Sequence, residues 1–556
     1  MKYFLIFLLI FSVIIGLVGC GANPVVPTDP TKGTEDPTEP TQTVQGKYPL
    51  NEKGECIVND GGVVNGVVDS NNRLYYQIFV GSFSDSNGDG IGDLRGIIER
   101  FDYLNDGDPN SGTSLGVEGL WLSPIFTSPS YHKYDVTDYY EIDPQFGTME
   151  DLKELIQLCH ERGVQIILDL VINHTAKNNE WYENFVYAQQ MEMVGNEYYN
   201  FYTWSEDRTG SVTWYSIAGT DKYYEGNFSS EMPELNFDNV VVRQAMLDVA
   251  KFYLDLGVDG FRFDAAKYVY YGDLNQNVAF WDWYMTELRT IKADIYTVAE
   301  VWDPDAGTFP YFSSTNCFNF SMSQAGGRIA EAAKGGNVNS FVNYVSGYWK
   351  NIKSINPNAF MVSFISNHDM DRAAGFLQVG NGQAQMAANL NVLLPGSSYI
   401  YYGEEIGMLG SRGASNTDAN RRLAMLWGDG DTIKNPVGSS YSANQVNGTV
   451  ADQLGKDDSL YNYYKKLITI RKANPEIANG EMTPLKTNIK AGGFLCTYNG
   501  STVAVIHNTT TKEVVIDLSA LTDVPLTTIA AFIGMGEATL DGSTLTIAPQ
   551  TSVVLR

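Results

Sequence analysis

Short apolar runs alternate with longer amphipathic stretches over most of this chain. Runs of strand length stand at residues 74–80, 119–122, 165–169, 260–263, 296–299, 360–364 and 398–402, with a weaker one at 318–320. They are rich in β-branched and aromatic residues, as buried strands are, and the stretches between them are long enough for helices. Eight strand–helix repeats predict an α/β fold, a closed (β/α)8 barrel.

The clearest helical pattern covers residues 149–162. Thr148 is suited to cap its N-terminus, and Gly163 is suited to end it. One face of the expected helix is apolar and consists of Leu152, Leu155, Ile156 and Cys159. This pattern predicts a helix that packs against the barrel strands.

Two parts of the chain do not fit a plain barrel. The interval between the third and fourth strands is too long for one connection, so residues 175–240, rich in Tyr, Trp, Asn and Gly, are expected to form an inserted domain. After residue 477 the pattern changes to short strands and turns, which predicts a β-sandwich over 478–556. The barrel domain would then consist of residues 48–174 and 241–477.

The N-terminus is typical of a targeting segment. Lys2 precedes an almost wholly apolar stretch that ends at Leu17-Val18-Gly19-Cys20, which resembles a bacterial lipobox. We therefore expect a signal peptide over 1–19, lipidation of Cys20, and a Pro/Thr-rich spacer over 20–47 that holds the protein outside the cell membrane. The alternatives are a short transmembrane anchor and an ordinary signal peptide.

Composition narrows the range of partners. The 556-residue chain has a formal net charge of −28 and a pI of about 4.5. This charge argues against nucleic acid, because phosphate binding requires Lys and Arg. It is typical of an acidic extracellular protein, with a halophile's surface as the alternative. Four cysteines beyond Cys20 are scattered without CxxC spacing, so we expect neither zinc nor an essential disulfide, and we expect a monomer.

Three carboxylates stand where predicted buried strands end. They are Asp264, Glu300 and Asp369. Burial of a carboxylate there lowers the stability of the fold, so such a residue is expected to have a charged or hydrogen-bonding partner or a function. In a barrel the C-terminal ends of the strands converge, and two carboxylates about 5–5.5 Å apart are what a retaining glycosidase requires.

The segments around these carboxylates resemble a known family. Asp-Leu-Val-Ile-Asn-His (169–174), Gly-Phe-Arg-Phe-Asp-Ala-Ala-Lys (260–267), Thr-Val-Ala-Glu-Val-Trp (297–302) and Phe-Ile-Ser-Asn-His-Asp (364–369) resemble the four ordered motifs of the α-amylase family, glycoside hydrolase family 13. Met-Pro-Glu-Leu-Asn (232–236) resembles an additional motif of the subfamily intermediate between oligo-1,6-glucosidases and neopullulanases (subfamily 36). The resemblance extends from about Leu74 to the C-terminus.

The resemblance implies a role for each matched residue. Asp264 would be the nucleophile, kept ionised by Arg262, and Glu300 would be the acid/base. Asp369 would bind sugar hydroxyls and favour the distorted ring. The implied substrate-binding residues are His132, Tyr134, His174, Arg262, Lys267 and His368. His160 and His507 lie outside the motifs and are expected to be structural.

A cation loop is expected directly after the first strand. Oxygen donors recur at every second position from Asp85 to Asp93, and glycines between them permit a tight turn. The loop resembles the calcium site of oligo-1,6-glucosidase-like enzymes, which implies Ca²⁺ as the cofactor. The ligands would be Asp85, Asn87, Asp89, Asp93 and the Ile91 carbonyl. The alternative is a hydrated turn. A second calcium of the family, near Asn173, is in doubt because Tyr268 replaces a common His.

Several functions share these motifs. Ala265, directly after the expected nucleophile, accompanies α-1,4 cleavage in the family, so the leading hypothesis is an endo-acting α-amylase on starch and maltooligosaccharides. A neopullulanase or a 4-α-glucanotransferase would use the same residues. A non-catalytic starch-binding surface lipoprotein would not need all three carboxylates, and neither would a solute-binding lipoprotein. Trp204, Trp214, Tyr223 and Tyr224 could stack on glucose units or pack the inserted domain.

Overall fold

The computed structural model describes residues 71–441, 445–488 and 491–556. The predicted signal peptide, Cys20, the spacer and Cys56 lie outside the described residues. Within the described part, no helix is both long enough and apolar enough to cross a membrane.

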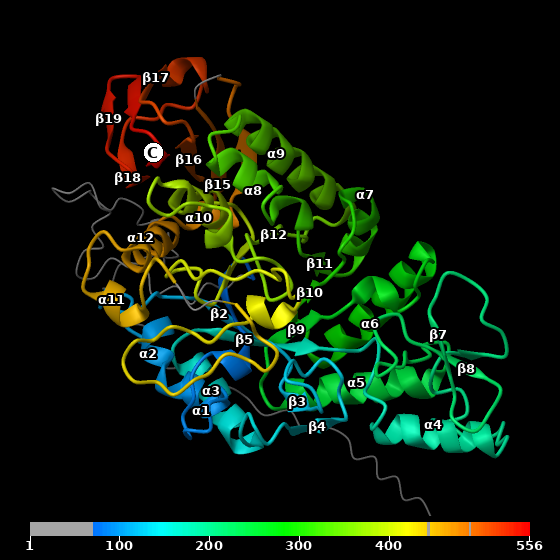
Figure 1. Ribbon diagram of the computed structural model, residues 1–556. Coiled ribbons are helices and arrows are strands. Elements are labelled where there is room, and N and C mark those ends of the chain that lie inside the picture. The colour runs from blue at the N-terminus through cyan, green and yellow to red at the C-terminus, as the bar shows by residue number, and fades with distance from the viewer. Residues whose placement is uncertain (1–70, 442–444, 489–490) are drawn as a thin grey trace, which may run out of the picture. The chain divides into compact units, whose positions relative to one another are not determined.

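Eight parallel strands form the barrel that the sequence predicts (Figure 1). The strands are β1 (Leu74–Ile78), β2 (Gly119–Leu122), β5 (Gln165–Leu170), β9 (Gly260–Phe263), β10 (Tyr296–Ala299), β11 (Asn316–Cys317), β12 (Val362–Ser363) and β13 (Ser397–Tyr401). Their order is β11-β10-β9-β5-β2-β1-β13-β12. A single parallel bridge from Phe318 to Val362 joins the two end strands, and the Asn319 N–H donates to the Val362 carbonyl at 2.9 Å.

The sixth strand differs from its prediction. It was expected at 318–320, but β11 ends at Cys317, and Phe320 already begins the 3-10 turn η4 (Phe320–Met322). Phe318 still donates its N–H to the Ala299 carbonyl at 3.3 Å and bridges to Val362, but the strand goes no further because the chain turns at Asn319 (φ −86°, ψ 87°). The apolar residues used for the prediction therefore mark the turn after the strand.

Helices surround the strands. They include α1 (Leu94–Glu99), α3 (Met149–Glu161), α5 (Val240–Asp255), α6 (Leu274–Ile291), α8 (Arg328–Ala333), α9 (Val338–Ile355), α10 (Gln383–Val392) and α12 (Leu460–Ala473). Helix α3 confirms its prediction, because the Thr148 side chain accepts from the Asp151 N–H in a capping box and the four expected apolar residues are buried. Gly163 follows it with φ +70°, a conformation that glycine adopts at little cost.

The barrel interior is filled with aromatic side chains. Tyr75 stacks on Tyr399 with ring centroids 4.9 Å apart, and the hydroxyls of Tyr296 and Tyr399 lie 2.8 Å apart. Trp121 is also buried in this cluster. Because side chains occupy the interior, a ligand site is expected at the C-terminal ends of the strands, where the connecting loops begin.

The connection from β5 to β9 contains additional elements. These are α4 (Glu180–Gln190) and the antiparallel strands β6 (Trp204–Ser205), β7 (Trp214–Ser216) and β8 (Tyr223–Glu225), in the order β6-β8-β7. The Leu235 N–H donates to the Asn173 carbonyl, which ties the end of this connection to the segment after β5. The domain boundaries at 174/175, 240/241 and 477/478 stay a prediction.

The C-terminal part consists of antiparallel sheets. One sheet has the order β14-β15-β16-β21-β18 and the other β17-β20-β19. Their strands are β14 (Glu481–Pro484), β15 (Gly492–Tyr498), β16 (Ser501–Asn508), β17 (Val514–Asp517), β18 (Ile529–Gly534), β19 (Ala538–Asp541), β20 (Thr544–Ile547) and β21 (Thr551–Leu555). Cys159, Cys317 and Cys496 are buried free thiols.

Candidate active site

The three predicted carboxylates meet in one cavity. Asp264 and Glu300 are the first residues after β9 and β10, and Asp369 ends the segment that follows β12. All three line a cavity of about 910 Å³. The other predicted residues that line it are His132, Tyr134, His174 and Lys267.

The buried guanidinium group of Arg262 contacts two of these carboxylates, Asp264 and Glu300, and also the carboxylate of Asp169. Arg262 Nη1 lies 2.7 Å from Asp264 Oδ1 and 2.7 Å from Asp169 Oδ1. Its Nη2 lies 2.9 Å from Glu300 Oε2. The Arg262 side chain is only 1% exposed, so these contacts have little screening by water. Arg262 therefore holds Asp264 and Glu300 close together.

Backbone geometry also positions Glu300. Ala265, directly after Asp264, has φ 49° and ψ 35°, a left-handed conformation that is uncommon for alanine. Its N–H donates to Glu300 Oε2 at 3.0 Å. The strained turn after β9 thus provides a hydrogen bond to the second carboxylate, as strained residues at functional sites often do.

Burial shifts the acid–base properties of the carboxylates. It raises the pKa of Glu300 to about 7, against the attraction of Arg262, and it raises the pKa of Asp169 to about 7 as well. It also raises the pKa of Asp264 above its ordinary value. We expected Arg262 to keep Asp264 ionised. Arg262 does lower the pKa of Asp264, but burial outweighs that effect.

Asp369 behaves differently from the other two. Burial would raise its pKa, but His368 and Arg422 hold that pKa well below the ordinary value. Its Oδ1 lies 2.7 Å from Arg422 Nη2, and its Oδ2 lies 3.0 Å from His368 Nε2. Asp369 is therefore ionised at neutral pH and is suited to accept hydrogen bonds from hydroxyl groups.

A hydrogen-bonded chain fixes His368 and Tyr134. Gln77 Nε2 lies 2.7 Å from His368 Nδ1, which leaves the proton of the neutral ring on Nε2. Nε2 lies 2.7 Å from the Tyr134 hydroxyl, which donates to Asp169 Oδ2 at 2.9 Å. His368 is fully buried and does not line the cavity, so it contacts Asp369 and Tyr134 on their side away from the cavity.

The other two histidines offer polar atoms to a ligand. His174 Nε2 is buried and has no hydrogen-bond partner among the described residues. The Tyr134 N–H donates to His132 Nδ1 at 3.1 Å, which leaves Nε2 of His132 as a donor. Burial lowers the pKa of both rings to about 4, so both are neutral at pH 7.

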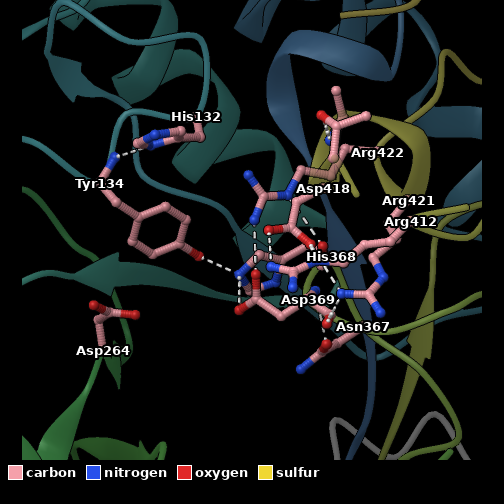
Figure 2. A network of polar contacts seen from close by, with 12 residues as sticks. His132, Tyr134, Asp264, Asn367, His368, Asp369, Arg412, Asp418, Arg421 and Arg422 are labelled. Carbon is pink, nitrogen blue, oxygen red and sulfur yellow. Dashed lines mark hydrogen bonds and ion pairs between the residues drawn. The ribbon is translucent and has the colours of Figure 1, made fainter. Parts of the chain in front are cut away.

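The loop after β13 adds residues that the sequence did not reveal. Arg422 binds Asp369, and its Nε donates to the His368 carbonyl at 3.0 Å. Asp418 pairs with Arg412 at 2.6 Å and with Arg421 at 2.9 Å. Figure 2 shows these charged groups gathered beside Asp369, with Tyr134 reaching toward His368 and Asp264 on the other side of Tyr134.

Aromatic residues contribute part of the cavity wall, but not the four that the sequence singled out. Trp204, Trp214, Tyr223 and Tyr224 do not line the cavity. Tyr224 is buried against Tyr182 and Tyr215, so it packs the inserted segment. The aromatic residues that line the cavity are Tyr131, Tyr134, Phe228, Tyr268 and Trp302.

The predicted cation loop lies between η1 (Val80–Ser82) and α1, and its residues do not line the cavity. Asp85 accepts from the N–H groups of Asn87, Gly88 and Gly90, and Asp93 caps α1 by accepting from the Gly96 N–H. No three His, Cys, Asp or Glu side chains converge on a metal position in the described part of the chain. The oxygen donors suit calcium chemically, and in this structure they bind backbone N–H groups.

The fold and the site together define a barrel enzyme with paired carboxylates at the C-terminal strand ends. Comparison with known proteins gives the family. Residues 77–480 match the α-amylase catalytic domain, and the chain belongs to this family, whose enzymes act on α-glucans.

Two relatives and one solved structure illustrate the similarity. The chain is 35% identical to α-amylase 3 of Dictyoglomus thermophilum over 450 residues, covering 79% of this chain and 84% of that protein. It is 30% identical to a 4-α-glucanotransferase of Thermotoga neapolitana over 462 residues, covering 80% and 97%. The structure of Eubacterium rectale Amy13B superposes with a TM-score of 0.80 at 34% identity, covering 87% of this chain and 95% of that one.

Proposed function

We propose that the protein is a retaining, endo-acting hydrolase of α-1,4 bonds in starch and maltooligosaccharides. The observation that carries the proposal is the Arg262 guanidinium, which binds Asp264 at 2.7 Å and Glu300 at 2.9 Å. Contact with one guanidinium group brings the two carboxylates near each other, which supports a covalent double displacement, because that mechanism uses a more closely spaced pair than the inverting one.

Each carboxylate has an environment suited to one role. With a pKa of about 7, Glu300 carries a proton on a substantial fraction of molecules at neutral pH and can donate it to the leaving oxygen. Asp264, with a hydrogen bond from Arg262 to Oδ1, would attack the anomeric carbon and form the glycosyl ester. Glu300 would then take a proton from water, which attacks the same carbon. Two inversions return the α configuration.

Three groups support the positioning of the sugar. Asp369 remains ionised and can accept hydrogen bonds from two hydroxyls. His174 Nε2 is a buried polar atom without a partner among the described residues, and a sugar hydroxyl would satisfy it. Tyr134 lies against the same cavity and offers an aromatic face to the ring.

The extent of the cavity supports an endo-acting enzyme. Its lining runs from Arg412 and Asp418 in the loop after β13 to Phe228 and Trp302 on other elements. A cavity of about 910 Å³ is near the upper end of ordinary ligand pockets, so it has room for several glucose units. A 4-α-glucanotransferase is the second candidate, since a relative at 30% identity bears that name and the same carboxylates would serve transfer.

The product profile from maltoheptaose tests the proposal. We expect internal cleavage to mixtures of shorter maltooligosaccharides, with few products longer than the substrate. Asp264→Asn and Glu300→Gln should each lower turnover by more than about 100-fold without unfolding the protein, and exposed Glu197→Gln is the control. Release of glucose alone from the chain end would contradict endo action. Mainly longer products would favour the transferase.

We also propose that lipid on Cys20 attaches the enzyme to the outer face of the cell membrane. The apolar stretch before Cys20 and the Pro/Thr-rich residues after it support this proposal. We also propose that calcium binds the loop from Asp85 to Asp93. The oxygen donors at every second position of this loop support the proposal.

A further inference from the structure

Two segments beside Asp369 are joined by contacts from side chain to backbone in both directions. Arg421, in the loop after β13, donates from Nη1 to the Asp369 carbonyl at 2.6 Å. Arg372, three residues after Asp369, donates from Nε to the Arg421 carbonyl at 3.0 Å, and its own N–H donates to the Gly410 carbonyl at 2.8 Å. The segment after β12 and the loop after β13 are therefore fixed to each other close to Asp369.

The guanidinium group of Arg372 is buried at this junction. Arg372 is only 1% exposed, and its Nη1 donates to the Tyr402 carbonyl at 2.6 Å. Its guanidinium carbon lies 4.4 Å from the ring centre of Tyr401 and 4.5 Å from that of Tyr402. These contacts are attractive, because the face of an aromatic ring is negative. One cation thus connects the end of β13 to the segment after β12.

The same two tyrosines hold the backbone on both sides of Arg422. The Tyr401 hydroxyl donates to the Arg421 carbonyl at 3.2 Å, and the Tyr402 hydroxyl donates to the Leu423 carbonyl at 2.6 Å. Because the carbonyls before and after Arg422 are both bonded, its backbone has little freedom to move. The position of Arg422 therefore depends on the two rings that the buried guanidinium contacts.

Arg422 in turn determines the orientation of the Asp369 carboxylate. Its Nη2 lies 2.7 Å from Asp369 Oδ1, while the other oxygen, Oδ2, lies 3.0 Å from His368 Nε2. Displacement of Arg422 would leave Oδ1 without its charged partner, and the carboxylate could then rotate. A misplacement of about 1 Å in an active site can lower the rate about 100-fold, even when its cause lies away from the reacting atoms.

We propose that Arg372 is a positioning residue for cleavage of the glycosidic bond, and that it acts by holding Arg422 against Asp369. The inference rests on the proposed function and adds a residue that does not line the cavity. Asp369 is expected to favour the distorted sugar ring, so its misplacement should weaken binding of the transition state more than binding of the substrate. Loss of Arg372 should therefore lower kcat and change KM little.

A double-mutant cycle tests whether Arg372 acts through Arg422. Arg372→Lys keeps the positive charge but replaces the planar group and its fixed donors by a single ammonium. We expect kcat for maltoheptaose consumption to fall roughly tenfold to a hundredfold, with KM changed less than about threefold. In a protein that already carries Arg422→Lys, the same change should lower kcat less than about threefold further, because residues that act through one contact are not additive.

Arg471 provides a matched control on α12. It is also only 1% exposed, and its guanidinium also donates to backbone carbonyls, those of Val392, Leu394 and Gly396. None of these residues lines the cavity. Arg471→Lys should lower the melting temperature as Arg372→Lys does, but kcat should stay within about twofold, with or without Arg422→Lys. Tryptophan fluorescence at the assay temperature verifies that each variant is folded.

Gly410→Ala provides the same test if Arg372→Lys does not fold. A Cβ at Gly410 would lie 2.5 Å from the Asn420 carbonyl oxygen and 3.1 Å from Arg372 Cδ, so it would displace the loop without removing a charge. Its effect on kcat should also shrink in the presence of Arg422→Lys. A loss that multiplies fully with that of Arg422→Lys would overturn the inference for either variant.

An unchanged kcat in folded Arg372→Lys would overturn the inference as well. Failure of the proposed function is a separate outcome, because consumption of maltoheptaose counts both hydrolysis and transfer. A wild-type protein that makes mainly longer products would refute the proposed hydrolysis, and the comparison of variants would still decide the role of Arg372.

Discussion

Replacement of Arg262 by glutamine should destabilise the protein in a pH-dependent way. The change removes a buried positive charge that contacts Asp169, Asp264 and Glu300 within 2.9 Å. Loss of one partner from a buried ion-pair network costs about 3–5 kcal/mol, because the remaining charges stay desolvated. We expect a decrease of that size in the free energy of unfolding at pH 8.

The sign of the pH dependence follows from proton uptake. Without Arg262, the buried carboxylates have folded-state pKa values raised further above their unfolded values of about 4. The folded variant then binds more protons than the unfolded chain, so its stability falls as pH rises from about 4 through the raised pKa values. The deficit relative to the wild-type protein should therefore be smaller at pH 5 than at pH 8.

Urea unfolding at pH 5 and pH 8, followed by tryptophan fluorescence, measures this deficit. Arg95→Gln is the control, because Arg95 also contacts two carboxylates, those of Asp151 and Glu154, but is 36% exposed. Exposed pairs contribute about 0–1 kcal/mol, so the control should change little at either pH. A deficit below 1 kcal/mol for Arg262→Gln, or a deficit that is larger at pH 5, would refute the reasoning.

Three further predictions follow from the site and from the N-terminal sequence. Because Glu300 must be protonated to act as an acid and has a pKa of about 7, kcat/KM should decline as pH rises above about 7, and a flat profile from pH 6 to 9 would exclude this role. Chelation of calcium should lower the melting temperature while leaving kcat at low temperature nearly unchanged, and Asp85→Ala should reproduce the loss. Elemental analysis that finds no metal in the purified protein would contradict the calcium proposal. Cys20→Ala should release active enzyme into the medium with the same kcat, whereas a variant that stays on the membrane would indicate a transmembrane anchor.

The barrel could be predicted from the sequence because its signals are local. Each strand is a short apolar run, and the helix after Thr148 has both a cap and an apolar face within a few residues. The failure at β11 has the same cause, since a two-residue strand carries little pattern of its own and the aromatic residues after it dominate the prediction.

The site was only partly predictable. Asp264, Glu300 and Asp369 stand at strand ends within recognisable motifs, so their convergence could be expected from the barrel. Arg422 could not be found in this way, because it contacts Asp369 from 53 residues further along, in a loop without periodic pattern. Phe228 likewise belongs to the inserted segment, where many aromatic residues look alike in sequence and only the fold distinguishes those that face the cavity.

The net pKa of Asp264 also depends on the fold. The motif shows Arg262 two residues before it, which predicts a lowered pKa. The opposing effect comes first from burial of Asp264 and then from the negative charge of Asp369, which lies in the segment after β12. Three-dimensional crowding of like charges is not visible in the sequence around one residue.

The most direct test of the central claim is the anomeric configuration of the first product. Proton NMR of maltoheptaose during the first minutes of hydrolysis records the new reducing end before mutarotation equalises the anomers. A double displacement through Asp264 and Glu300 predicts that the α-anomer appears first and the β-anomer follows by mutarotation. Initial release of the β-anomer would show a single displacement and would contradict the assignment of Asp264 as the nucleophile.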